Sequence, residues 1–251
     1  MSINKRQQQI VQWVNEQGRQ NVQALALKFN VSVQTIRTDM RVLTEQGLLL
    51  RSHGEAIPFP NRENISYNQR QIRNANAKAH IAKLCCSQLV DYQSLFLGSG
   101  TTITELAKLL HHFKGLQIMT TNIHAVSHLA QSEGCVLTLS GGRVRLRDQD
   151  IIGGDAIRFY QRYQADVGIV SVGAMDHKGN LYDYNDDEIM AREALLAQCQ
   201  YRILLIDSTK FDSQSRCLSG SLTDFDCVIS DQKLSLKLTN MLLAKKISVL
   251  Y

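Results

Sequence analysis

The residues best suited to bind a small anion lie in LGSGTTITEL, positions 97 to 106. An apolar strand is predicted to end at Gly98, and the next four residues lead directly into a predicted helix. Backbone N–H groups and hydroxyls converge at such a turn, where the helix dipole favours negative charge. This predicts a phosphate-binding turn, although any tight strand-to-helix turn also favours glycine and a hydroxyl cap for structural reasons. The predicted contacts are Gly98, Ser99, Gly100, Thr101 and Thr102.

No cofactor motif accompanies this turn. No GK[ST] follows it, which excludes a P-loop, and GGDA at 153 to 156 does not form a dinucleotide fingerprint. We therefore expect no cofactor.

Polar residues also follow three other predicted strands. Because the carboxyl ends of parallel strands meet at one edge of a sheet, we expect these residues to face one crevice. They are Thr120, Thr121 and Asn122 after the second strand, Ser140, Gly141 and Gly142 after the third, and Asp207, Ser208, Thr209 and Lys210 after a later one.

An acidic segment, LYDYNDDEIMAR, lies between these strand ends. Its carboxylates could accept hydrogen bonds from the hydroxyls of a polyol. The alternative is a helix start at which acids complement the dipole. The residues concerned are Asp183, Asp186, Asp187, Glu188 and the following Arg192.

A different chemistry is predicted near the amino terminus, in VSVQTIRTDMRVL. Ser32 is the expected N-cap of a helix that turns Ile36, Met40 and Leu43 inward. Its outer face offers long donors and short hydroxyls, which suit base edges and phosphates in the DNA major groove. The outward residues are Gln34, Thr35, Arg37, Thr38 and Arg41.

The elements around this helix predict a winged helix-turn-helix over residues 1–57. Apolar residues at helical spacing indicate a first helix from Lys5 that Gly18 ends, and a second helix from Asn21. Past Gly47, LLLRSHGEAI fits a β-hairpin wing, from which Arg51 and His53 would reach the DNA backbone or the minor groove.

Charge and proline content place a boundary after this domain. Residues 1–75 hold ten Lys/Arg and five Asp/Glu, which accounts for the whole net charge of +5. A basic front segment is expected where only that segment meets a polyanion, although a solvated basic surface would look the same. Both prolines, Pro58 and Pro60, lie in a polar stretch that predicts a linker over 58–75.

From residue 76 to 251, short apolar runs alternate with helical patterns. Runs of this kind are buried on both faces of a parallel sheet, so we expect a doubly wound α/β domain with its ligand at the carboxyl ends of the strands. The predicted strands are SLFLG, LQIMTTN, VLTLSG, VGIVSVG, YRILLID, CVIS and ISVLY, and the predicted helices are TTITELAKLLHHF, HAVSHLAQ and REALLAQC.

The remaining composition indicates a cytoplasmic protein without a metal site. The six cysteines form no CxxC pair and no apolar leader precedes them, which predicts reduced thiols. No apolar run approaches the roughly 18 residues of a membrane span. The histidines at 111, 112, 124 and 128 follow an amphipathic helical pattern without a nearby carboxylate or thiol, so we expect no metal ligand among them.

These motifs together resemble the DeoR family of bacterial transcription regulators. VSVQTIRTDMRVLTEQGLLLRSHGEA at 31 to 56 is similar to the family pattern VSxxTIRRDLxxLxxxGxLxRxHGGA, with Thr38 in place of an arginine and Glu55 in place of a glycine. The rear half is similar to the family's sensor, with GxGTT, TN, GG and DxSKF elements in the same order. Asp212 stands where the family usually has glycine, and Glu193 where it often has arginine.

The resemblance implies a fold, a function and two partners. It implies a sensor domain resembling ribose-5-phosphate isomerase, binding to double-stranded operator DNA, and an effector that is a small phosphorylated sugar or polyol. It also implies that Glu188, Arg192 and Lys210 join the effector site. The segment from RDQDIIGG at 147 to Glu188 points to glycerol 3-phosphate as the effector.

The sequence suggests three classes of function. The first is a transcription repressor that an effector releases from its operator by linkage. The second is a sugar-phosphate isomerase with an accessory nucleic-acid-binding domain, in which Asp183, Glu188 and Lys210 would be acid–base candidates. The third, a nucleic-acid-processing enzyme, lacks a metal cluster. The fused basic domain favours a repressor that is not an enzyme. We expect a homodimer or homotetramer, because one small winged module buries too little surface for tight specific binding to DNA.

Overall fold

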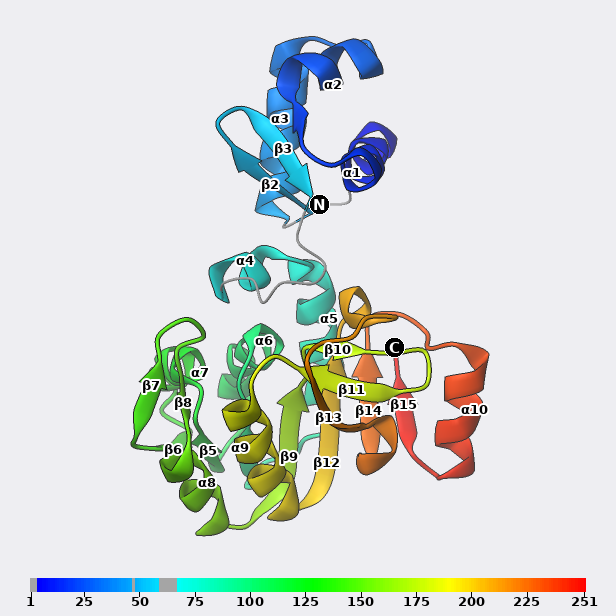
Figure 1. Cartoon of the computed structure of the whole chain (residues 1–251). Coiled ribbons are helices and arrows are strands. Elements are labelled where there is room, and N and C mark those ends of the chain that lie inside the picture. The colour runs from blue at the N-terminus through cyan, green and yellow to red at the C-terminus, as the bar shows by residue number, and fades with distance from the viewer. Residues whose placement is uncertain (1–3, 47, 59–66) are drawn as a thin grey trace. The chain divides into compact units, whose positions relative to one another are not determined.

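The structure is a computed structural model that describes residues 4–46, 48–58 and 67–251. It divides into two compact units, Met1–Ala75 and Asn76–Tyr251, each of which is described by itself (Figure 1). Residues 59–66 of the predicted linker lie outside the described residues. The rest of that stretch contains a helix, α4 (Tyr67–Ile72), and the first residue of α5 (Ala75–Cys86).

The front unit is a three-helix bundle with a small sheet. Its helices are α1 (Lys5–Gln17), α2 (Val22–Phe29) and α3 (Val33–Glu45). Asn4, Asn21 and Ser32 cap them, each accepting a hydrogen bond from a backbone N–H in the first turn. The inward faces form one apolar core, and its fully buried members include Ile10, Val14, Leu25, Ile36 and Leu43.

The wing is the hairpin of β2 (Leu49–Ser52) and β3 (Glu55–Pro58). Its two turn residues, His53 and Gly54, both have positive φ values of 48° and 82°, as a type I′ turn requires. Glu55 lies after the turn in extended backbone, so the family's second glycine is not needed for this turn. A third strand, β1 (Gln20–Asn21), pairs with β3 and was not predicted.

The rear unit is built on a seven-stranded parallel sheet in the order β15-β14-β12-β9-β4-β5-β6. Every strand predicted from an apolar run belongs to it. The chain starts at β4, winds outward to β6, and then returns to β9 on the other side of β4. The β4/β9 boundary is therefore the topological switch point. The strands are β4 (Ser94–Leu97), β5 (Leu116–Thr120), β6 (Cys135–Leu139), β9 (Ala165–Ser171), β12 (Cys199–Ile206), β14 (Cys227–Ser230) and β15 (Ser248–Leu250).

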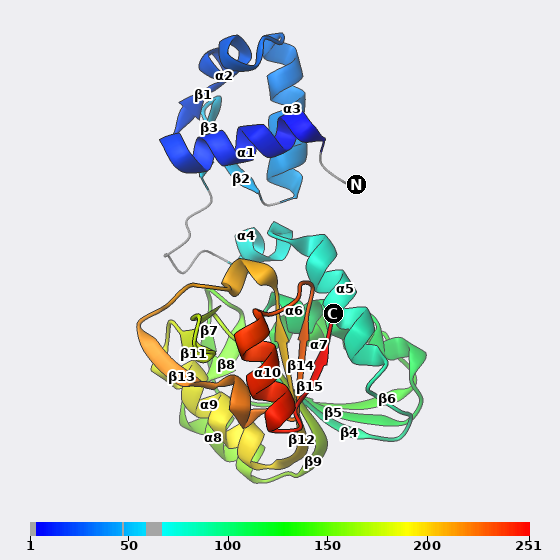
Figure 2. The ribbon, with the colours of Figure 1, turned by 90° about the vertical axis from the view of Figure 1, so that its right-hand side faces the viewer.

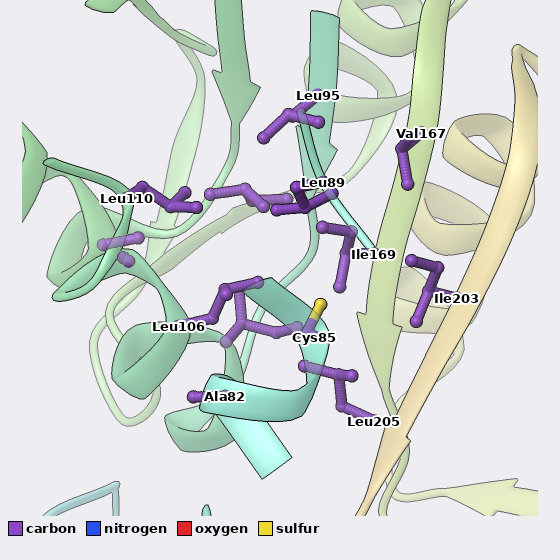
Figure 3. Packing of buried hydrophobic residues seen from close by; sticks show 14 of the residues in the cluster. Ala82, Cys85, Leu89, Leu95, Leu106, Leu110, Val167, Ile169, Ile203 and Leu205 are labelled. Atoms are coloured by element: carbon purple, nitrogen blue, oxygen red, sulfur yellow. The ribbon is translucent and has the colours of Figure 1, made fainter. Parts of the chain in front are cut away.

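Helices cover both faces of this sheet, as the continuous apolar strands predicted. On β4, Leu95 and Leu97 belong to one core and Phe96 to the other, because successive side chains point to opposite faces. Figure 3 shows the first core, where Cys85 and Leu106 meet strand residues such as Ile169. Figure 2 shows the two helical layers on opposite sides of the sheet. One layer consists of α5, α6 (Thr101–Ala107) and α7 (Ile123–Leu129). The other layer consists of α8 (Gly154–Gln161), α9 (Asp186–Ala197) and α10 (Leu236–Ala244).

Two smaller sheets were not predicted. One is the hairpin of β7 (Arg143–Arg145) and β8 (Asp150–Ile152). The other joins β10 (Ala174–Met175), β11 (Asn180–Asp183) and β13 (Cys217–Ser221). Their strands are short or interrupted by polar residues, so they form no apolar run.

All six cysteines are free thiols. Within the described residues, no helix is both long enough and apolar enough to cross a membrane.

Candidate effector site and DNA-binding surface

A cavity lies at the switch point, beside the carboxyl ends of β4 and β9. Its volume is about 20 Å³, enough for a water-sized group. The lining residues come from the β4–α6 turn, the residue after β5, strand β8, the end of β9 and the helices α8 and α9. They are Gly98, Ser99, Thr121, Asp150, Ile151, Ile152, Tyr160, Val170, Ser171, Glu188, Ala191, Arg192 and Leu195.

The predicted phosphate-binding turn forms one wall of this cavity. Ser99 donates its hydroxyl proton to Oε1 of Glu188 at 2.9 Å. Gly100 has φ 106°, and a Cβ there would lie 2.7 Å from the Ser171 hydroxyl, so only glycine fits without strain. Thr101 and Thr102, in the first turn of α6, are buried. The turn therefore brings Gly98 and Ser99 to the cavity, with the two threonines behind them.

Glu188 lines the cavity and holds Arg145, which is not among the described lining residues. The second carboxylate oxygen of Glu188 accepts a hydrogen bond from Arg145 Nη1 at 2.9 Å. Asp150 holds the same guanidinium in a bidentate pair of 2.9 and 2.6 Å, and Asp148 lies 3.3 Å from Nε. Burial alone would lower the pKa of Arg145, but the Asp150 hydrogen bonds and the Glu188 charge outweigh burial and raise it. Arg145 is therefore a permanent cation at this site.

Arg192 supplies a second cation. Its Nη1 donates to the Ser171 carbonyl at 3.2 Å, and its Nη2 lies 2.6 Å from Oδ2 of Asp183. This ion pair is buried, with 7% and 4% of the two side chains exposed. Burial raises the pKa of Asp183, and the Arg192 charge opposes this rise. Asp183 also accepts from the Gly173 N–H at 2.8 Å. It therefore orients Arg192, which lines the cavity.

Two predicted contacts from the second strand take different roles. Thr121 lines the cavity, and its hydroxyl lies 3.2 Å from the Tyr160 hydroxyl. Asn122 is fully buried and caps α7, and its amide donates to the carbonyls of Gly98 and Gly100 at 3.3 and 3.4 Å. Asn122 therefore supports the phosphate-binding turn from behind.

The single crevice expected from the polar strand ends is divided in the structure. Gly141 and Gly142 follow the edge strand β6 and line a separate open cavity of about 390 Å³, together with Arg158 and Arg162. Lys210 ends the short helix η2 (Ser208–Lys210) after β12 and is not among the described residues that line the switch-point cavity.

Sequence reasoning missed Arg145, Asp150, Tyr160 and Ser171. The β7–β8 hairpin brings the first two to the site, because the Ile151 N–H donates to the Thr121 carbonyl at 2.9 Å and joins the hairpin to the end of β5. The signal that could have found the first two is the segment RVRLRDQD at 143 to 150, where arginine at every second position is followed by Asp148 and Asp150. Ser171 lies inside the predicted strand VGIVSVG and is the last residue of β9 in the structure.

The outer face of α3 is open in the front unit. Gln34, Arg37, Thr38 and Arg41 are exposed and Thr35 is half-buried. The Thr38 hydroxyl donates to the Gln34 carbonyl at 3.1 Å, so its remaining capacity is that of an acceptor.

The ends of this surface carry the other predicted DNA contacts. Ser32 caps α3 by accepting from the Thr35 N–H at 3.1 Å. Arg51 and His53 are exposed on the wing.

The two family departures near the effector site can be placed. Asp212 has φ 50°, in the left-handed region where glycine is favoured and aspartate is tolerated. Both Asp212 and Glu193 are exposed, and neither is among the described residues that line the cavity.

Residues 73–232 match the sequence model of the DeoR C terminal sensor domain, and residues 6–58 match the DeoR-like helix-turn-helix domain. The glycerol-3-phosphate regulon repressor of Escherichia coli is 30% identical over 92% of this chain and 92% of its own. Its namesake in Haemophilus influenzae is 31% identical over 90% of this chain and 88% of its own. The L-fucose operon activator of H. influenzae is 28% identical over 92% and 93% of the two chains.

Similar solved structures include ribose-5-phosphate isomerases. That of Methanocaldococcus jannaschii covers 55% of each chain at 14% identity with a TM-score of 0.41, and a phospho-erythronic acid complex covers 55% of each at 16% identity with a TM-score of 0.40. The two matching family models and the full-length relatives agree with the winged helix-turn-helix and the α/β sensor found here. The chain belongs to the DeoR family of transcription regulators.

Proposed function

We propose that this chain is a repressor of a carbohydrate or polyol operon that binds double-stranded operator DNA through α3 and the wing. The observation that carries this proposal is the pair Arg37 and Arg41, both exposed and one helical turn apart on a helix whose other face is core. Two guanidinium groups at that spacing suit adjacent contacts in the major groove. Operator binding would place the protein in the cytoplasm, with the chromosome.

The proposed effector is a small phosphorylated sugar or polyol, with glycerol 3-phosphate as the leading candidate. Ser99 and Arg192 of the cavity lining support an anion, and Arg145 lies next to them through its hydrogen bond to the lining residue Glu188. Asp150 and Glu188 offer carboxylate acceptors for hydroxyls. Two relatives at 30% and 31% identity carry the name of the glycerol-3-phosphate regulon. Effector binding would lower operator affinity by linkage between the two sites.

The direct test uses the full-length chain and an operator selected from a random duplex pool. Calorimetry should show binding of glycerol 3-phosphate and little binding of glycerol, because the phosphate supplies the charge that the two arginines recognise. Gel shifts should then show weaker operator binding with glycerol 3-phosphate and no change with glycerol. If no member of a panel of phosphorylated sugars and polyols changes operator affinity, the effector proposal fails.

The isomerase alternative has less support. It needs Glu188 and Lys210 around one substrate, yet Lys210 does not belong to the described lining of the cavity. We expect no interconversion of aldose and ketose phosphates above the uncatalysed rate. Turnover that Glu188→Gln abolishes would favour an enzyme instead.

A further inference from the structure

One carboxylate holds two of the donors that an anionic effector would need. Oε1 of Glu188 accepts from Ser99 Oγ and Oε2 accepts from Arg145 Nη1, each at 2.9 Å. Glu188 is itself largely buried, with 19% of its side chain exposed. It therefore bridges the phosphate-binding turn of β4–α6 and the β7–β8 hairpin.

A phosphate cannot use these donors while Glu188 keeps them. The Ser99 hydroxyl has one proton to donate, and that proton already points to Glu188. A dianion within reach of Ser99 would lie a few ångströms from the carboxylate, and like charges so close in a partly buried site repel strongly. Either the phosphate stays away from Ser99 or Glu188 moves.

Glu188 is the partner that can move. Arg145 is 12% exposed and is fixed by three hydrogen bonds or ion pairs to Asp148 and Asp150, which belong to its own hairpin. Ser99 is set by a turn whose Gly98 and Gly100 carbonyls accept from Asn122. Glu188 lies in the first turn of α9 on a side chain with three rotatable bonds.

We propose that Glu188 is an internal competitor of the effector: the phosphate group displaces this carboxylate and takes over Ser99 and Arg145. This assigns Arg145 as an effector-binding residue. It also gives Glu188 a different role from the one stated above. Glu188 does not bind the hydroxyls of the polyol but sets the concentration of anion that is needed to fill the site. This inference rests on the effector site of the proposed function, and it adds that the phosphate enters that site by displacing Glu188.

The two roles of Glu188 predict opposite effects of one substitution. In Glu188→Gln the side chain keeps its shape and loses its charge. The uncharged amide binds Arg145 less strongly than the carboxylate does and does not repel a phosphate. Inorganic phosphate and glycerol 3-phosphate should therefore bind about tenfold tighter, or more. A residue that binds effector hydroxyls would instead lose affinity on the same change. Isothermal calorimetry on the full-length chain measures the difference.

The matched control is Asp187→Asn. Asp187 precedes Glu188 in α9 and pairs with Arg143 of the same hairpin at 2.6 Å, but Arg143 is exposed, Asp187 is only half-buried, and neither lines the cavity. This variant removes the neighbouring ion pair between hairpin and helix and should leave phosphate affinity within about twofold. Arg145→Lys, which retains the charge but loses the forked geometry, should weaken glycerol 3-phosphate binding.

The outcomes separate this inference from the proposed function. Tighter binding of inorganic phosphate by Glu188→Gln supports the inference, even if no phosphorylated polyol acts on the operator. Weaker or equal binding of both ligands by Glu188→Gln overturns it, even if glycerol 3-phosphate releases the wild-type protein from DNA. Should Glu188→Gln fail to fold, Glu188→Ala carries the same prediction of tighter binding and the same contrary result.

Discussion

Arg6 on α1 and Asp39 on α3 lie 33 residues apart and form an ion pair of 2.7 Å between Nε and Oδ2. The Asp39 side chain is 4% exposed, and it accepts two further hydrogen bonds, from Arg6 Nη2 at 3.3 Å and from the Gln7 amide at 2.9 Å. The Asp39 hydrogen bond raises the pKa of Arg6. Asp39 points away from the exposed face of α3, so this network connects the proposed DNA-reading helix to α1.

Asp39→Ala should destabilise the front unit. The change leaves Gln7 and Arg6 without their acceptor, and a loss of about 2 kcal/mol in the free energy of unfolding is expected. Trp13 is the only tryptophan of the chain and packs on the front core, so its fluorescence in a urea titration of the full-length protein reports on this unit. Glu45→Ala, an exposed change on the same helix, should have little effect. Equal stability of both variants would contradict the role given to Asp39.

Arg37→Ala and Arg41→Ala should weaken operator binding. Loss of a bidentate guanine contact would cost about 1–3 kcal/mol and relax specificity at one position, whereas loss of a phosphate contact would weaken all sequences alike and reduce the salt dependence. Gel shifts at two salt concentrations distinguish these cases. Arg158→Ala removes one positive charge from the rear unit and serves as the control. Unchanged binding by the Arg37/Arg41 double variant would exclude α3 as the reading helix.

Gly100→Asp should abolish effector binding and leave operator binding intact, giving a repressor that cannot be induced. The new side chain would start 2.7 Å from the Ser171 hydroxyl and bring a carboxylate to the anion site. Because φ is 106° at this position, the variant also carries backbone strain.

Gly179→Ala is the control for that strain, since Gly179 also has positive φ and close neighbours but lies in the turn between β10 and β11, not in the phosphate-binding turn. Calorimetry with glycerol 3-phosphate should separate the two variants. Loss of binding in both would mean that strain alone explains the effect.

Acid should weaken the turn around Asp176. Burial alone would raise the pKa of this carboxyl, but hydrogen bonds from Asn180, Lys178 and Tyr182 outweigh burial and lower it to about 2. Because the folded pKa lies below the ordinary value of 3.8, this stabilisation is fully present above about pH 4 and is lost as the pH falls towards 2.

Asp176→Asn should therefore cost about 1–2 kcal/mol at pH 6, allowing for solvent screening near the surface, and less at pH 3. Urea titrations at the two pH values give the comparison. Asp155→Asn, at an exposed side chain, should show a small cost at both. If the difference in unfolding free energy between the wild-type protein and Asp176→Asn is as large at pH 3 as at pH 6, the role given to the Asp176 carboxylate is wrong.

The protein should assemble symmetrically. A single winged module buries about 600–1,000 Å² on DNA, and two modules that read repeated half-sites double that area. Light scattering at micromolar concentration should therefore give the mass of a dimer or tetramer, a multiple of the 28.3 kDa chain. A monomer would refute the proposal.

Some of this molecule follows from short-range patterns. Strands β4, β5, β6, β9, β12, β14 and β15 each appear in the sequence as an apolar run. The central strands need such runs because both of their faces are buried, as in β14, whereas the edge strand β6 leaves Val136 exposed. The sequence pattern that predicts α3, the proposed DNA-reading helix, is also short-range. Ser32 caps the helix, and Ile36, Met40 and Leu43 repeat along its buried side. The positive φ values of the wing turn lie at His53 and Gly54, where the glycine-centred hairpin was predicted.

The composition of the candidate site was decided by tertiary structure. Polar residues end several strands, but the order of strands in the sheet determines which ends are neighbours. The order β9-β4-β5-β6 places Ser99 beside Ser171 and puts Gly141 at the far edge. Arg145 and Glu188 are 43 residues apart and meet because a hairpin whose strands form no continuous apolar run folds against the end of β5. Apolar periodicity reports burial within one element, whereas such a contact depends on how separate elements pack, so the Ser99–Glu188–Arg145 bridge could be found only in the folded chain.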